Sequence, residues 1–230
     1  MSREALKTDA KYAMREAIVS PYIVTLIFGV ITVVFSAVEF FLDTWEELLD
    51  NGGFGSPDQM RAFAVSSIIF FIIYFVLSTI IQFGYYSYCL KVANRDHSMS
   101  YGDLFSPVKY LLKALGLVFL STLFILLWAL LLIIPGIIAA YRYSQSIFIM
   151  VEDPDKGVMQ CIRESKEMME GHKWEYFVLE LSFILWQLLI FATCGLALIY
   201  VYPYMTVTFA NYYNALKHKP SVYDGTTVYY

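Results

Sequence analysis

Six apolar stretches, separated by shorter polar ones, dominate the hydrophobic pattern of the chain. Their approximate bounds are residues 17–42, 62–92, 111–134, 137–151, 176–193 and 196–216. A helix needs about 20 apolar residues to cross the hydrocarbon core of a bilayer, and backbone surrounded by lipid must satisfy its hydrogen bonds internally. The pattern therefore predicts an all-α polytopic membrane protein, with six transmembrane helices in a membrane domain over residues 17–217.

Turn-forming residues divide the six segments into three hairpins. Pro135 cannot continue a helix interior without losing a hydrogen bond, and Gly136 tolerates turn geometry, so we expect a tight turn between the third and fourth segments. Gly195 marks the corresponding turn between the fifth and sixth segments. The expected structural turns or bends are at Pro135, Gly136, Gly195 and Pro203.

The basic residues predict the orientation of these segments. All but Arg61 and Arg142 of the 16 lysines and arginines lie in four stretches: before the first segment, between the second and third, between the fourth and fifth, and after the sixth. The loop between the first and second segments is acidic, with Asp43, Glu46, Glu47, Asp50 and Asp58. The positive-inside rule places both termini of this multi-pass chain in the cytoplasm.

Two of the basic stretches have the spacing of amphipathic helices. In residues 1–16, which we expect to form a cytoplasmic helix lying in the membrane interface, one helical stripe holds Leu6, Ala10, Ala13 and Met14. Residues 153–171 show a similar pattern and end at Gly171, a residue suited to helix termination. Residues 218–230 are expected to form a cytoplasmic tail.

These amphipathic helices have two interpretations, and the sequence leaves both open. They present a surface to a cytoplasmic partner, or they only seal the inner face of the helix bundle. In the first interpretation the partner surface consists of Arg163, Lys166, His172 and Lys173.

The composition agrees with lipid as the main solvent. Hydrophobic residues make up 59% of the chain and charged residues 16%, whereas soluble domains have about 45–50% and about 25%. A soluble chain of 230 residues could not hide this much apolar surface in its own core.

Catalytic and metal-binding patterns are lacking in the sequence. The histidines, His97, His172 and His218, have no motif partner, and the cysteines, Cys89, Cys161 and Cys194, are far apart and are interpreted as small buried hydrophobes. No metalloprotease, nucleophile-elbow or phosphate-loop motif occurs. We therefore expect no enzymatic activity, no cofactor, no metal and no nucleic-acid partner.

A few polar residues interrupt the membrane segments, and Arg142 and Glu180 are the two charges placed well inside them. Buried charge in a membrane is costly and usually faces the bundle interior or a water-filled cavity. One interpretation is an intramembrane polar site formed by Arg142, Tyr143, Gln145, Glu180 and Gln187. The other is that Arg142 extends outward to the interface and Glu180 bonds to neighbouring helices.

The second half of the chain carries a resemblance to a known protein family. The residues that carry the resemblance are Ser165-Lys166, Met168-Met169, Gly171-His172-Lys173, Leu181-Ser182-Phe183, Trp186, Gly195, Pro203-Tyr204 and Tyr212-Tyr213. Further matching positions are Ile134-Pro135-Gly136, Tyr143-Ser144, Asp153-Pro154, and Leu6-Lys7 with Ala10-Lys11 near the N-terminus. With these residues the chain resembles the bacterial integral membrane family known as the domain of unknown function 975. The resemblance implies a polytopic protein of the bacterial plasma membrane and implies no reaction.

Together these features favour a non-enzymatic membrane protein with an accessory or regulatory role. Its expected partners are membrane lipids and a cytoplasmic or membrane protein. The alternative is a transporter, or a protein that handles lipids or small molecules, with its polar site near Arg142.

Overall fold

The computed structural model describes residues 2–51, 57–217, 221–223 and 226–228. Its elements are α1 (Arg3–Glu16), α2 (Pro21–Asn51), α3 (Pro57–Ala93), the 3₁₀ helix η1 (Tyr101–Tyr110), α4 (Leu111–Leu131), α5 (Ile133–Tyr143), α6 (Ser146–Glu152), α7 (Val158–Met168), α8 (Lys173–Leu181), α9 (Ile184–Ala192), α10 (Leu198–Lys217), and the paired strands β1 (Ser221–Tyr223) and β2 (Thr226–Val228). Apart from that short antiparallel pair, the regular elements of the described part are helical.

The N-terminal helix forms where the sequence predicts it, but its apolar stripe packs on protein. The Ser2 hydroxyl accepts a hydrogen bond from the amide of Ala5, which caps α1. Ala10, Ala13 and Met14 are buried where α1 packs against α10 and α3. The expected membrane-interface helix is therefore a helix whose apolar side is covered by the bundle.

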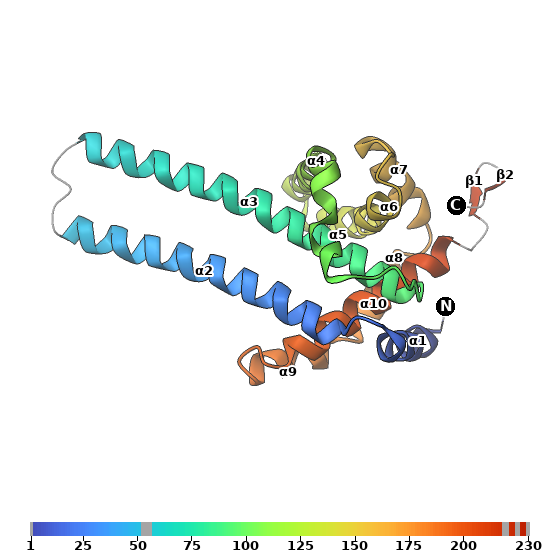
Figure 1. The fold of residues 1–230 in the computed structure, drawn as a ribbon. Coiled ribbons are helices and arrows are strands. Elements are labelled where there is room, and N and C mark those ends of the chain that lie inside the picture. The colour runs from blue at the N-terminus through green and yellow to red at the C-terminus, as the bar shows by residue number, and fades with distance from the viewer. Residues whose placement is uncertain (1, 52–56, 218–220, 224–225, 229–230) are drawn as a thin grey trace.

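The hairpin of α2 and α3 projects away from the other helices (Figure 1). The α2 helix has 31 residues, so at 1.5 Å per residue it is about 46 Å long, which exceeds a hydrocarbon core of about 30 Å. Val33 and Ile68 are 67% and 60% exposed. The acidic residues predicted for the connection lie in α2 and, for Asp58, at the start of α3, and their side chains are outside the part that the structure describes.

The turn predicted at Pro135 and Gly136 lies slightly earlier in the structure. Leu132 is extended and separates α4 from α5, so Pro135 falls in the first turn of α5, where its missing amide hydrogen costs nothing. Gly136 serves close packing: a Cβ built on it would lie 2.7 Å from the Cβ of Ala129. The two residues start the second helix of this hairpin and do not form the turn.

Two predicted segments are each divided into two helices. Segment 137–151 breaks after α5 and resumes as α6, and segment 176–193 breaks at Ser182-Phe183 between α8 and α9. The expected turn at Gly195 is present, with φ of +89°. Pro203 is buried inside α10, so the chain makes no turn between helices at this position.

Four stretches are long and apolar enough to cross a membrane: Pro21–Val38, Val65–Ala93, Tyr101–Leu131 and Lys173–Ala192. Only 11–18% of these windows is buried inside the protein, so their apolar surface requires lipid or another chain. The described part of the chain is therefore helical and has four segments long and apolar enough to span a membrane, which is the pattern of a membrane protein.

The protein core lies around α10, which is the most buried helix and carries Tyr204, Tyr212 and Tyr213 on its buried faces. Tyr85 and Phe148 from α3 and α6 are fully buried beside it. Rings stack within this core, for example Phe148 on Tyr213 with centroids 5.5 Å apart. Aromatic packing thus connects the N-terminal, middle and C-terminal helices.

Candidate functional site: two polar regions at the helix junctions

The break between α5 and α6 is stabilised by a serine from α7. The Ser165 hydroxyl donates to the carbonyl of Arg142 at 3.0 Å and accepts from the amide of Gln145 at 3.1 Å. A helix break frees such backbone groups, and leaving them unpaired when buried is costly. Ser165 therefore holds the residues of the predicted polar site in place.

Arg142 and Glu180 do not form the pair that a shared site would favour. Glu180 accepts a hydrogen bond from the Tyr141 hydroxyl at 2.9 Å, so it bonds to a neighbouring helix. Within the described residues, no ion pair joins it to Arg142. This agrees with the second interpretation of Glu180.

Two buried polar atoms near the break have no partner in the described structure, Nε of Arg142 and Oε1 of Gln145. Gln145 is fully buried and uses its amide nitrogen to donate to the Ser144 hydroxyl at 2.9 Å. A cavity of about 200 Å³ borders Arg142, between Trp128 of α4 and Pro135 of α5. An unpaired buried polar atom costs about 1–3 kcal/mol, so water or a small polar ligand would be favoured here.

Tyr143 and Gln187 contribute less to this region. The ring of Tyr143 packs at 6.1 Å from that of Phe124, and its carbonyl accepts from the Ser146 hydroxyl. Gln187 is half-buried on α9, and no hydrogen bond to the Arg142 region involves its side chain in the described structure. The structure thus groups Arg142 with Gln145, and places Glu180 with Tyr141.

The predicted partner surface is divided between two elements. Arg163 and Lys166 are exposed on α7. His172 lies at the start of α8, where its ring is 3.2 Å from the Glu175 carboxylate, and its carbonyl accepts from the Tyr212 hydroxyl. Lys173 is the first residue of α8 and is half-exposed.

The three cysteines differ in exposure. Cys89 and Cys161 are buried, as expected, but Cys194 is exposed, because it lies in the turn before α10 with φ of +49°. Burial, with a smaller contribution from Glu164, raises the pKa of the Cys161 thiol to about 11. Cys194 is therefore the accessible thiol of the three.

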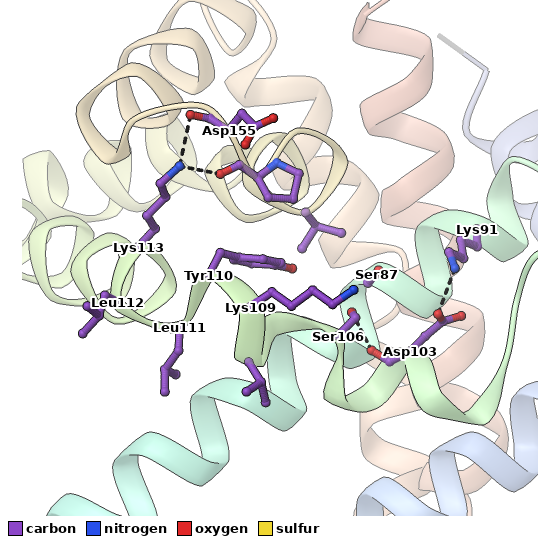
Figure 2. Close-up of a pocket in the computed structure, with 13 residues that line it drawn as sticks. Ser87, Lys91, Asp103, Ser106, Lys109, Tyr110, Leu111, Leu112, Lys113 and Asp155 are labelled. Atoms are coloured by element: carbon purple, nitrogen blue, oxygen red, sulfur yellow. Dashed lines mark hydrogen bonds and ion pairs between the residues drawn. The ribbon is translucent and has the colours of Figure 1, made fainter.

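A second polar region, missed by the sequence analysis, lies where α3, η1, α4 and the α6–α7 connection meet. It is a cavity of about 970 Å³, and Figure 2 shows the side chains around it. Its charged and polar lining residues are Lys91, Lys109, Lys113, Asp103, Asp155, Ser87, Ser106 and Tyr110.

The walls of this cavity are fixed by specific hydrogen bonds. Lys91 of α3 pairs with Asp103 of η1 at 2.8 Å, and the amide of Ser100 donates to the same carboxylate at 2.8 Å. Lys113 donates to the carbonyls of Pro154 and Asp155 at 2.7 and 3.1 Å. The cavity therefore connects α3 to η1, the start of α4 and the α6–α7 connection.

One sequence signal could have revealed this cavity. Lys109 and Lys113 are four residues apart at the start of the apolar α4 run, so they share one side of the helix entrance. By the positive-inside rule alone, these two lysines indicate only the orientation of the segment. The elements that complete the cavity, α3 and the α6–α7 connection, come from distant parts of the chain.

Residues 129–220 match the family model described as "Protein of unknown function (DUF975)". This range contains α5 to α10, and therefore the Arg142 region and the exposed face of α7. Searches of curated proteins and of solved structures found no match. Residues 129–220 are therefore similar to the DUF975 family.

Proposed function

We propose that the chain is a non-enzymatic, multi-pass protein of a bacterial plasma membrane that acts as an accessory or regulatory component by binding a protein partner. Six membrane segments form three hairpins in this proposal: α2 with α3, α4 with α5–α6, and α8–α9 with α10. Both termini and α7 face the cytoplasm, which the distribution of lysine and arginine supports.

The observation that supports the proposal is that α7 is amphipathic. Its inner side buries Cys161, Ile162 and Met168 against the bundle, while Arg163 and Lys166 are exposed on its outer side. A basic surface held on a packed helix favours association with an acidic surface of a partner. Sealing the bundle and binding a partner are thus compatible roles for one helix.

Charge reversal on this surface tests the proposal. The full chain and its Arg163→Glu/Lys166→Glu variant are purified after mild detergent extraction, and the accompanying proteins are compared. We expect a reproducible partner that the variant loses. Arg3→Glu, an exposed change on α1, serves as the matched control and should retain the partner. Recovery of a lone protein, or equal retention by all three forms, would contradict the proposal.

The cavity at Arg142 supports a second candidate function, a transporter or a protein that handles lipids or small molecules. Its specific support is the unpaired Nε of Arg142 beside that cavity. Guanidinium groups favour carboxylates as partners, so small carboxylates such as acetate and benzoate are suitable probes. We expect them to raise the melting temperature of the wild type and of Tyr143→Phe, and to have no effect on Arg142→Ala. Equal shifts in all three proteins would exclude this function.

A further inference from the structure

We propose that the cavity between α3, η1, α4 and the α6–α7 connection binds the phosphate of an anionic phospholipid headgroup. Its volume of about 970 Å³ lies at the upper end of the range for ligand pockets, which is about 300–1,000 Å³. The site is distinct from the Arg142 cavity and from the exposed face of α7.

Positive charge inside the cavity is only partly neutralised. The Lys91 ammonium is paired with Asp103, but Lys113 bonds to two carbonyl groups, which carry no net charge. In the described part of the chain, no carboxylate is hydrogen-bonded to Lys109. The remaining acidic lining residue, Asp155, is exposed at the rim. The lining therefore retains a positive excess that an anion would offset.

Polar groups converge on the position that such an anion would occupy. In Figure 2 the Lys109 side chain extends across the cavity toward Ser87, and the Tyr110 hydroxyl points the same way. Within the described residues, the Ser87 and Tyr110 hydroxyls make no hydrogen bond, so both remain available to a phosphate oxygen. Charge-assisted hydrogen bonds to a phosphate are about twice as strong as neutral ones.

The position of the cavity identifies the phosphate as that of a lipid. It lies at the start of α4, within a candidate membrane span, and its lining includes Val108 and Leu112, which are 55% and 85% exposed. Basic pockets between membrane helices bind lipid headgroups at this depth, and exposed apolar side chains next to the lysines would contact the acyl chains. The assignment to the cytoplasmic leaflet rests on the proposed topology, whereas the binding site itself does not.

Native mass spectrometry of the full chain in detergent tests this inference, with phosphatidylglycerol and phosphatidylcholine as probes. We expect the wild type to retain one phosphatidylglycerol in preference to phosphatidylcholine. The charge of one lysine near a lipid surface changes the affinity for an anionic lipid about fivefold. Lys109→Ala should therefore lower the retention of phosphatidylglycerol about fivefold. Lys109→Arg should restore it. Arg15→Ala, which removes an exposed basic side chain on α1, should leave retention unchanged.

Soluble probes distinguish a lipid site from a general anion site. Inorganic phosphate and glycerol 3-phosphate at millimolar concentration should displace little of the retained lipid, because they lack the acyl contacts at Val108 and Leu112. Full displacement by inorganic phosphate would overturn the lipid assignment. Equal retention of both lipids, or equal losses in Lys109→Ala and Arg15→Ala, would overturn the site. Protection of the buried Cys89 from thiol reagents verifies that each variant is folded.

Discussion

At the scale of single residues, glycine determines how closely the helices approach. A Cβ built on Gly84 of α3 would overlap the backbone carbonyl of Leu104 in η1. A backbone atom cannot rotate away as a side chain can, so this contact requires the absence of a side chain. A Cβ built on Gly29 of α2 would have no atom within 4 Å, so a substitution at Gly29 is a suitable control.

We predict that Gly84→Ala destabilises the protein and Gly29→Ala does not. Overpacking destabilises a protein by about 1–3 kcal/mol. The upper end of this range applies to Gly84→Ala because the backbone of η1 must move. The melting temperature should therefore fall by about 6–12 °C. Gly29→Ala should be neutral or slightly stabilising, since alanine is the better helix former. The measurement is the temperature at which a thiol-reactive dye labels the buried Cys89 in detergent. Equal melting temperatures for the two variants would show that η1 adjusts freely.

At the scale of elements, α1 depends on packing far more than on its charged contacts. Arg95 lies 2.6 Å from the carboxylate of Asp9 and 2.9 Å from that of Glu16, and the hydrogen bond that Arg95 donates to Asp9 is the largest cause that raises the pKa of Arg95. All three side chains are exposed, and exposed ion pairs contribute little stability. Ala10 and Ala13, in contrast, are buried against the bundle.

A charge at a buried position should therefore release α1. We predict that Ala10→Glu detaches the helix, because burying an unpaired carboxylate costs several kcal/mol. Trypsin should then cleave after Lys7, Lys11 or Arg15 at least about ten times faster, since cleavage follows the population of the open form. Thr8→Glu adds the same charge at an exposed position of α1 and should leave the digestion rate unchanged. Identical digestion of both variants would contradict the packing argument.

The sequence predicts these elements better than it predicts what covers them. The stripe of Ala10, Ala13 and Met14 is readable from helical spacing, but its cover is α10, and the Leu6 carbonyl accepts from Asn211, 205 residues away. Local patterns carry no information about such distant contacts. The same limit explains the misplaced turn at Pro135, because proline is equally suited to a turn and to the first turn of a helix.

The candidate sites show this limit as well. Arg142 is conspicuous in the sequence because charge is rare in an apolar segment, and the structure does place it beside a cavity. Ser165, which fixes the break next to Arg142, gives no such signal, since serines are common in polar helices. The cavity lined by Lys91, Lys109 and Lys113, here called the lysine cavity, is formed by three segments that are distant in the sequence. In the sequence alone, Lys109 and Lys113 therefore indicate only the orientation of the membrane segments.

At the scale of the whole molecule, the described helices form a core around α10 from which the α2–α3 hairpin extends (Figure 1). The four candidate membrane spans are at most 18% buried. The isolated chain therefore exposes far more apolar surface than a soluble protein does. Lipid on these faces, with the basic loops on one side, is the arrangement that accounts for both the exposure and the charge distribution.

Thiol labelling tests this orientation, because Cys194 is exposed while Cys89 and Cys161 are buried. An impermeant maleimide added to intact cells should label Cys194, which lies in the turn assigned to the outer face. Buried Cys161 is a poor marker of the inner face, since burial alone protects it and its raised pKa keeps the thiol protonated. Met159→Cys in a Cys194→Ala background is the better marker, because Met159 is 57% exposed on α7. It should react only after the membrane is permeabilised. Labelling of Met159→Cys in intact cells, with Cys194 protected until permeabilisation, would establish the opposite orientation and place α7 and the lysine cavity outside.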